Sequence, residues 1–195
     1  MTGRQSWAAP VFDRLYAEKA DPWGFETSVY ERDKYAATLD ALDGRHFISG
    51  FEAGCSIGVF THALASRCDR LLATDISEVA LQRARVRCCD QPTIDFLHAA
   101  LPASWPAARH YDLITFSEIL YFMDEADIRQ TAMLAREHLM PGGLVLTVNW
   151  TGATNTPVTG DAASTIFHAG SQLHLDQTWR HASYRLDRFL GPPAE

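Results

Sequence analysis

The chain has 195 residues, of which 47% are hydrophobic and 11% aromatic, and its formal net charge is −7. This length favours one domain, and so large an apolar fraction excludes a chain that is disordered over most of its length. The acidic balance argues against a nucleic-acid-binding protein, because such proteins carry a basic surface, but it suits a small neutral or cationic substrate.

Two helices are predicted before the first strand, over residues 7–20 and 29–42. The first has apolar residues at helical spacing. Ser28 is a candidate N-cap of the second helix, and Glu31, three residues further on, completes the pattern of a capping box. Both helices precede the part of the chain in which strands and helices alternate.

From residue 47 onward strands and helices alternate, which predicts a doubly wound, mostly parallel α/β sheet of Rossmann-like type with helices on both faces. The run Leu113-Ile114-Thr115-Phe116 is apolar on both faces, as in a central parallel strand. The predicted strands are residues 47–52, 70–74, 93–98, 111–117 and 144–149, and the predicted helices between them are residues 59–66, 77–87 and 125–139.

The pattern after residue 150 is weaker. Residues 151–159 are rich in Thr, Gly and Asn and are interpreted as a loop. A helical turn is predicted over residues 164–169 and a late, antiparallel strand over residues 179–190.

The chain carries no sign of a membrane span, a signal peptide or a metal site. No segment approaches the ~20 apolar residues of a transmembrane helix, and the first 20 residues lack the apolar run of a signal peptide. None of the four cysteines pairs with a histidine at zinc-site spacing. We therefore expect a soluble, cytoplasmic protein with reduced thiols and no metal.

The first candidate binding feature is the loop Glu52-Ala53-Gly54-Cys55-Ser56-Ile57-Gly58, which directly follows the first predicted strand. Glycine lets the backbone turn tightly and approach a ligand, and the next helix offers free N–H groups at its N-terminus. In doubly wound folds the ligand lies at this edge of the sheet. A plain strand-to-helix turn also favours glycine, so the loop alone leaves both interpretations open.

Asp75 provides the second feature, because it closes the next apolar strand, 21 residues after Gly54. An acidic residue at about this distance accepts hydrogen bonds from ribose hydroxyls, although an aspartate here also suits the start of a helix. The loop lacks the third glycine of a dinucleotide fingerprint, since Phe60 and Thr61 follow Gly58. These features favour a nucleoside without a pyrophosphate, as in S-adenosylmethionine (SAM).

Two later segments complete a recognisable order. The strand at Tyr111 runs out into Ser117 and Glu118 at the ligand edge, and Leu139-Met140-Pro141-Gly142-Gly143-Leu144 breaks a helix before the last parallel strand. With the glycine loop and Asp75, this order resembles class I SAM-dependent methyltransferases over residues 47–150. The resemblance implies a SAM cofactor, with S-adenosyl-L-homocysteine (SAH) as its product.

The resemblance also implies a role for each matching segment. The loop carrying Glu52, Gly54, Cys55 and Gly58 surrounds the amino-acid end of SAM. Asp75, followed by Ile76, holds the ribose. The adenine lies near Ala99, Ala100 and Leu101. Many members of the family have an aspartate where this chain has Ala100, so backbone contacts must serve the adenine here.

Residues 21–35, taken together with Ser117-Glu118-Ile119-Leu120-Tyr121, are similar to the nodulation protein S (NodS) methyltransferases of rhizobia. That resemblance implies N-methylation of the free amine on the non-reducing glucosamine of a deacetylated chitooligosaccharide, during Nod factor synthesis. We expect one methyltransferase domain over residues 1–195, divided into an N-terminal helical lid (1–44), a cofactor-binding core (45–150) and a substrate-side part (151–195).

Methyl transfer from a sulfonium depends mainly on in-line positioning of the nucleophile. An amine must lose its proton to attack, and Glu118 is the candidate carboxylate that holds the amine or accepts the proton, with Tyr121 as the next candidate. Arg32 or Lys34 could reach the SAM carboxylate, although either could equally be an ordinary solvated side chain.

Three other functions stay open at this stage. A nicotinamide-dependent oxidoreductase has the same fold but needs a further glycine and a phosphate-binding group. A non-catalytic SAM-binding regulatory module cannot be distinguished by motifs, because an enzyme that acts by positioning leaves no unique catalytic residue. A methyltransferase of another small amine or hydroxyl would share every feature described above.

Overall fold

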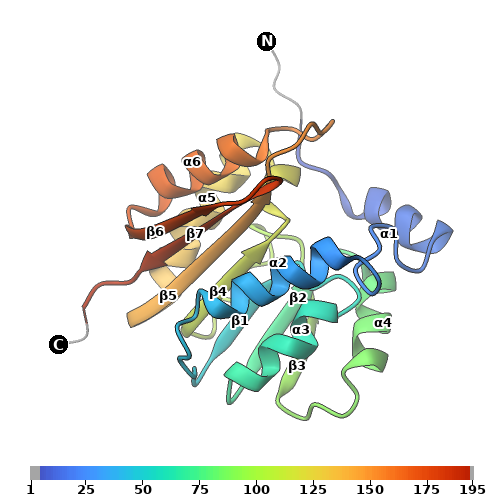
Figure 1. Ribbon diagram of the computed structural model, residues 1–195, viewed down its shortest axis with the longest axis horizontal. Helices are drawn as coiled ribbons and strands as arrows, with labels where there is room; N and C mark the ends of the chain where they lie inside the picture. The colour runs from blue at the N-terminus through green and yellow to red at the C-terminus, as the bar shows by residue number, and fades with distance from the viewer. Residues whose placement is uncertain (1–4, 194–195) are drawn as a thin grey trace. The chain divides into compact units, whose positions relative to one another are not determined.

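The computed structural model describes residues 5–193, in which strands and helices alternate as predicted (Figure 1). Its elements are α1 (Ala9–Glu18), α2 (Val29–Asp40), β1 (Gly50–Ala53), α3 (Val59–Leu64), η1 (Ala65–Arg67), β2 (Leu71–Asp75), α4 (Glu78–Arg87), β3 (Ile94–His98), β4 (Tyr111–Ser117), η2 (Leu120–Phe122), α5 (Glu125–His138), β5 (Leu139–Trp150), α6 (Gly160–Ser171), β6 (His174–Arg180) and β7 (Tyr184–Leu190).

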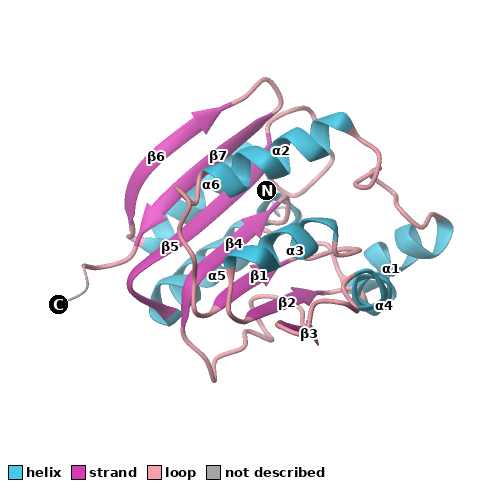
Figure 2. Cartoon of the chain, turned by 60° about the horizontal axis from the view of Figure 1, so that its bottom comes forward, coloured by secondary structure: helices cyan, strands magenta, loops and turns pink. Residues whose placement is uncertain are grey.

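The described chain forms two compact units, residues 8–99 and residues 5–7 with 100–193. In the first unit β1 pairs with β2 and β2 with β3, all parallel. In the second, β4 and β5 are parallel, whereas β7 pairs antiparallel with both β5 and β6 (Figure 2). The strand order 3-2-1-4-5-7-6 is that of a mostly parallel, doubly wound α/β sheet, so the predicted fold class is confirmed.

The first unit is built around β1 and β2, whose residues are all buried. Apolar runs of this kind suit parallel strands that are covered on both faces. Two apolar clusters adjoin the carboxyl ends of these strands. One contains Cys55, Ala73, Leu81 and Ala84, and the other contains Tyr16, Ile57 and Ala80. The loop after β1 therefore rests on a packed core.

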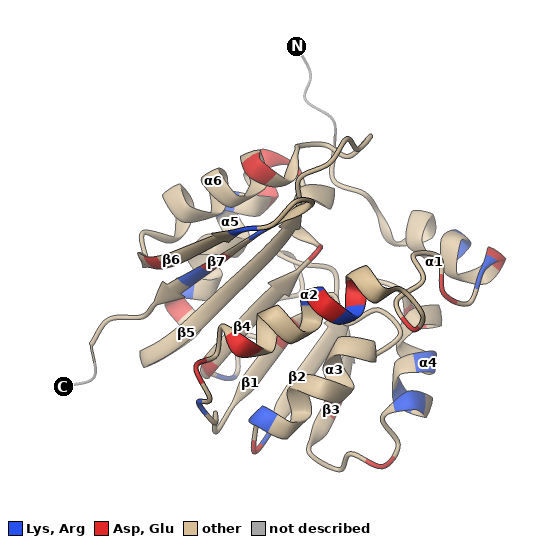
Figure 3. Ribbon diagram, in the orientation of Figure 1, with Lys and Arg blue, Asp and Glu red and all other residues tan. Residues whose placement is uncertain are grey.

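Helix α2 begins as predicted, because the Ser28 side chain accepts a hydrogen bond from the Glu31 backbone N–H. The N–H of Ser28, which Glu31 would accept in a full capping box, donates to the Gly24 carbonyl at 2.9 Å. The Glu31 carboxylate instead pairs with Lys34, 2.8 Å away, and both side chains are buried. Charges of both signs therefore follow one another in the first half of this helix (Figure 3).

The second unit differs from the prediction at its end. α6 runs over 12 residues rather than one turn, and residues 174–190 form the hairpin β6–β7 rather than one strand. The α6 sequence is rich in Gly, Ser and Thr, which are weak helix formers. Its stability comes from the Thr159 cap, which is a local helix-start signal, and from burial of Ala163 and Phe167, which a local pattern does not reveal.

Candidate functional site

The loop after β1 has an unusual backbone conformation. Gly54, Ser56 and Gly58 all have a positive φ, of 76°, 52° and 81°. The N–H groups of Gly54 and Cys55 both donate to the Thr74 carbonyl, at 2.7 and 2.8 Å, so the loop is tied to the end of β2. Left-handed backbone suits glycine but is uncommon for serine, so Ser56 must be held there by its surroundings.

Asp75 lies at the carboxyl end of β2 and binds this loop. Its Oδ2 accepts a hydrogen bond from the Ser56 N–H, and its Oδ1 accepts one from the Ser77 N–H, each at 2.8 Å. Burial raises the pKa of the carboxyl group to about 6, and the N–H donors oppose that shift. Asp75 is therefore a buried hydrogen-bond acceptor, and each backbone bond stabilises its ionised form.

Glu52 lies two residues before Gly54 and is 2% exposed. Its Oε2 atom has no hydrogen-bond partner within residues 5–193. Burial raises the pKa of this carboxyl group to about 8. The nearby Thr61 hydroxyl opposes the shift, and the neighbouring charge of Asp75 adds to it. Below pH 8 the group is therefore mainly neutral, and its Oε2 is a buried, unsatisfied polar atom beside the glycine loop.

The structure joins further predicted residues to Asp75. The Ala99 N–H donates to the Asp75 carbonyl at 3.0 Å, and the Ile76 carbonyl lies 2.9 Å from the His98 ring. Gly54, Cys55, Gly58, Asp75, Ile76 and Ala99 thus adjoin one another at the carboxyl ends of β1, β2 and β3. Ala100 and Leu101 belong to the other unit, where the Ala100 carbonyl accepts the Ser104 N–H.

A second group of predicted residues lies at the end of β4. Ser117 ends the strand, and Glu118 follows with a φ of 62°, a left-handed conformation for a residue with a side chain. The Glu118 Oε2 accepts hydrogen bonds from the Tyr121 hydroxyl at 2.7 Å and from the Trp150 N–H at 2.9 Å. Strained residues of this kind often mark functional sites, because the surroundings must hold them.

The two predicted basic residues of α2 differ sharply. Arg32 is exposed and pairs with its neighbour Asp33 at 3.2 Å. Lys34 is 1% exposed, bonded to Glu31, and its Nζ lies 5.1 Å from the Tyr30 ring centroid. The assignment of Arg32 to a cofactor carboxylate therefore stays a prediction, and its neighbour Lys34 is the buried cation.

No helix among the described residues has the length and apolar character needed to cross a membrane. In the same part of the chain, no group of three or more His, Cys, Asp or Glu side chains could hold a metal ion.

A family model described as nodulation protein S (NodS) matches residues 12–140 of the chain. The chain belongs to the NodS family. Nodulation protein S of Bradyrhizobium diazoefficiens is 33% identical over 105 residues, which cover 53% of this chain and 49% of that protein. Nodulation protein S of Rhizobium tropici is 30% identical over 125 residues, covering 63% and 52% respectively. The chain thus spans about half the length of the curated relatives that it matches.

Among solved structures, the N-methyltransferase NodS from Bradyrhizobium japonicum WM9, in complex with SAH, is similar with a TM-score of 0.82. The two chains are 25% identical, and the match covers 94% of this chain and 98% of that one. The resemblance to the NodS family that the N-terminal motifs indicate is therefore confirmed, and it extends through the C-terminal elements.

Sequence analysis of this NodS family member missed three residues beside Asp75. Tyr16 and Asp13 come from α1, and Ser77 caps α4. Only one signal was available in the sequence: Asp13 and Tyr16 are three residues apart in a predicted helix and so share a face. Nothing local indicates which loop that face meets.

Proposed function

We propose that this chain is a SAM-dependent N-methyltransferase that methylates the free amine of the non-reducing terminal glucosamine of a deacetylated chitooligosaccharide, in Nod factor biosynthesis. The observation that carries the proposal is membership of the NodS family combined with a glycine loop bonded to a buried acid, Asp75. The solved relative that holds SAH is itself an N-methyltransferase.

The residues of the first unit fit SAM. The Asp75 carboxylate accepts hydrogen bonds from the N–H groups of Ser56, Ile76 and Ser77. Its two oxygens offer about four lone-pair sites between them, so the carboxylate keeps capacity for a ribose hydroxyl. The orphaned Glu52 Oε2 is a polar atom that an ammonium-bearing ligand near the loop would help to satisfy. The partly exposed Gly54 and Ser56 offer backbone to the amino-acid end, with Cys55 and Gly58 shaping the loop.

When bound, SAM supplies a methyl group that is already activated by its sulfonium. The protein then has to orient the amine and remove its proton. We assign both tasks to Glu118, because the Tyr121 hydroxyl and the Trp150 N–H hold its Oε2 in one orientation. Tyr121 acts on Glu118 and, through it, on the amine. Ile76, Ala99, Ala100 and Leu101 are assigned to the adenosine part, with Ser117 at the end of β4 and Arg32 on α2 as further cofactor contacts.

We place the reaction in the cytoplasm, with an oligosaccharide substrate and without a nucleic-acid or membrane partner. We assign the lid to residues 1–44 and the substrate side to residues 151–195, of which residues 1–4 and 194–195 lie outside the described part of the chain. The net charge of −7 suits a substrate that arrives as an ammonium ion.

The test is methyl transfer from SAM carrying a labelled methyl group onto a chitooligosaccharide whose terminal amine is free. The fully acetylated oligosaccharide of the same length is the matched control, because it lacks only the nucleophile. We expect labelling of the first and not of the second. Label in neither, with SAH bound normally, would contradict the substrate assignment and leave a SAM-binding module or another methyl acceptor.

A further inference from the structure

Helix α1 contacts the candidate cofactor site through two polar side chains. The Tyr16 hydroxyl lies 2.5 Å from the Ser56 Oγ, and the Ser77 hydroxyl donates to the Asp13 Oδ1 at 2.5 Å. Asp13 and Tyr16 are three residues apart, so one face of α1 presents both. This face therefore meets the glycine loop after β1 and the start of α4 together.

The same two serines are the backbone donors of Asp75. The Ser56 N–H bonds to one carboxylate oxygen and the Ser77 N–H to the other. The hydrogen bonds form one continuous chain from Asp13 through Ser77, Asp75 and Ser56 to Tyr16. The Asp75 Oδ2 is thus connected through Ser56 to Tyr16, and its Oδ1 through Ser77 to Asp13.

Three residues of this chain of bonds are buried, whereas Asp13 and Ser56 are partly exposed. Tyr16 is 3% exposed, Ser77 is fully buried and Asp75 is 7% exposed. The Tyr16 ring packs with Ile57 and Ala80, and this packing holds its hydroxyl against Ser56. Ser56 is the loop residue whose left-handed backbone needs external support, and the Tyr16 hydroxyl bonds to that residue.

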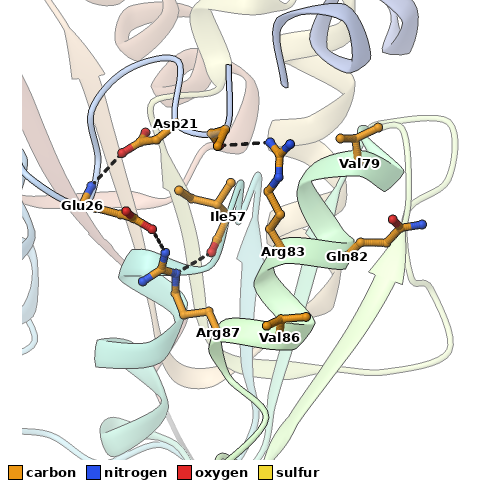
Figure 4. Close-up of a pocket in the computed structure, with 9 residues that line it drawn as sticks. Asp21, Glu26, Ile57, Val79, Gln82, Arg83, Val86 and Arg87 are labelled. Atoms are coloured by element: carbon orange, nitrogen blue, oxygen red, sulfur yellow. Dashed lines mark hydrogen bonds and ion pairs between the residues drawn. The ribbon is translucent and has the colours of Figure 1, made fainter. Parts of the chain in front are cut away.

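Helix α4 forms hydrogen bonds to α1 and to the turn that follows it. The Arg83 Nη1 donates to the carbonyls of Tyr16 and Ala20, at 2.9 and 3.0 Å. The Arg87 Nε donates to the Ile57 carbonyl at 2.8 Å, and its guanidinium also pairs with Glu26 (Figure 4). These two arginines line an open crevice of about 600 Å³ whose lining includes Ile57 but not Asp75. The contacts to Asp75 are therefore separate from that crevice.

We propose that Asp13 and Tyr16 are positioning residues, which hold Ser56, Ser77 and the carboxylate of Asp75 in the geometry that binds the cofactor ribose. The inference rests on the proposed function in one respect, that SAM or SAH is the ligand. α1 thereby acts on cofactor affinity through the serines, without itself touching the cofactor. Loss of either contact leaves the Asp75 carboxylate less constrained and weakens binding.

The experiment measures the dissociation constant of SAH by calorimetry, with the unfolding temperature of each variant. Tyr16→Phe keeps the packed ring and removes only the hydroxyl. Tyr111→Phe is the matched control, because that tyrosine is fully buried and its hydroxyl bonds the Pro106 carbonyl. We expect affinity about tenfold weaker for Tyr16→Phe and unchanged for Tyr111→Phe. Asp13→Ala should also weaken SAH binding, and it tests the idea without altering the apolar cluster.

A pH profile supplies a readout that a purely structural role would not move. Besides burial, the groups that shift the pKa of Asp75 are the N–H groups of residues 56, 76 and 77, which lower it, and the charge of Asp13, which raises it. The other ionisable groups facing Asp75 are Tyr16 of α1, Glu52 of β1 and Cys55 of the loop, and the charge of Asp75 raises the pKa of each. SAH affinity should fall as the pH drops through about 6, where Asp75 gains its proton. Asp13→Asn keeps an acceptor for Ser77 but removes a negative charge that raises this pKa, so the midpoint should move to lower pH.

The possible outcomes distinguish a wrong cofactor assignment from a wrong positioning role for Asp13 and Tyr16. If the wild-type protein does not bind SAH, the proposed cofactor is wrong and this inference falls with it. If the wild type binds SAH and both Tyr16→Phe and Asp13→Ala bind it equally well, the cofactor stands and the positioning role is overturned. An unmoved midpoint in Asp13→Asn likewise contradicts the link between Asp13 and Asp75.

Discussion

Asp75 is an acid whose side chain connects two backbone segments. Its carboxylate bonds the N–H groups of Ser56 and Ser77, so it fixes the glycine loop relative to the start of α4. Burial favours its neutral form, whereas those bonds favour its ionised form. When it is ionised, the buried carboxylate is suited to accept hydrogen bonds from a ligand.

We predict that Asp75→Ala weakens SAH binding by about tenfold to a hundredfold, the equivalent of roughly 1.5–3 kcal/mol for a lost charged hydrogen bond. Asp69→Ala is the control, because Asp69 lies just before the same strand and is exposed. Calorimetry gives the affinities, and circular dichroism checks that both variants fold. A folded Asp75→Ala that binds SAH like the wild type would refute the ribose assignment.

Glu118 combines an unusual backbone conformation with a hydrogen-bonded carboxylate. Its φ is 62°. Its N–H donates to the Val148 carbonyl, and its Oε2 accepts hydrogen bonds from Tyr121 and Trp150, so both ends of the residue are held. Such a side chain is presented in one direction, which is what the orientation of an amine requires.

We predict that Glu118→Gln lowers kcat for amine methylation by about 10²-fold or more, as expected for a lost general base. SAH affinity should barely change, since Glu118 is assigned to the amine. Glu125→Gln, an exposed glutamate at the start of α5, is the control. The measurement is kcat against pH on the free-amine oligosaccharide. A kcat within about threefold of wild type with an unmoved profile would reduce Glu118 to a structural acid.

At the scale of elements, glycine serves two different purposes in the loop between β1 and α3. A Cβ on Gly58 would lie 3.0 Å from the Cα and Cβ of Ala84, and its φ is 81°. Gly58 therefore permits α3 to begin close against α4. Gly54, also left-handed, is partly exposed, and we propose that its backbone meets the cofactor.

We predict that Gly58→Ala lowers the free energy of unfolding by about 1–3 kcal/mol, from overpacking added to backbone strain. Gly44→Ala is the matched control, since it has a φ of 71° but nothing within 4 Å of the added methyl. The difference between the two variants in urea unfolding isolates the clash. Equal losses would mean that only the φ matters.

The segment of residues 21–35 combines fixed and exposed parts. Asp21 accepts the N–H groups of Phe25 and Glu26, and Phe25 packs on the Tyr16 cluster. Trp23 and Val29, in contrast, are 40% and 59% exposed. A segment that is held at one end and exposes apolar side chains is suited to close over a ligand.

We predict that SAH slows hydrogen exchange across residues 23–35, as expected if this segment closes over the cofactor. Helix α5, whose first turn carries its own Asp124 cap, serves as the internal reference and should change little. Equal protection of residues 23–35 with and without SAH would remove the lid assignment.

For the whole molecule, the buried acids beside the glycine loop set how stability responds to pH. Glu52 has a pKa of about 8 in the folded protein, against 4.5 for an ordinary glutamate. Between these values the folded state keeps a proton that the unfolded chain has released, so stability falls as the pH rises. Asp75, raised from 3.8 to about 6, acts in the same direction in the lower part of that range.

We predict a loss of up to about 1.4 kcal/mol per pH unit between pH 6 and 8 in the wild type, the value for one proton. Glu52→Gln should flatten this slope, because the amide does not titrate. Glu125→Gln, changed at an exposed position, should keep it. Urea unfolding at four pH values gives the slopes, and an equal slope in Glu52→Gln would show that Glu52 is ionised in the folded state.

Short segments of sequence predict the parallel core and its glycine loop, because apolar strands, the glycines and the acid that ends β2, Asp75, are all local features. β4 runs from Tyr111 to Ser117 as predicted. The length of α6, the hairpin β6–β7 and the burial of Lys34 depend instead on how the folded elements pack. The same packing joins Tyr16 to Ser56 and Ser77 to Asp13, pairs that are 40 and 64 residues apart. Such contacts depend on which faces meet after folding, and a local pattern specifies the face but not its partner.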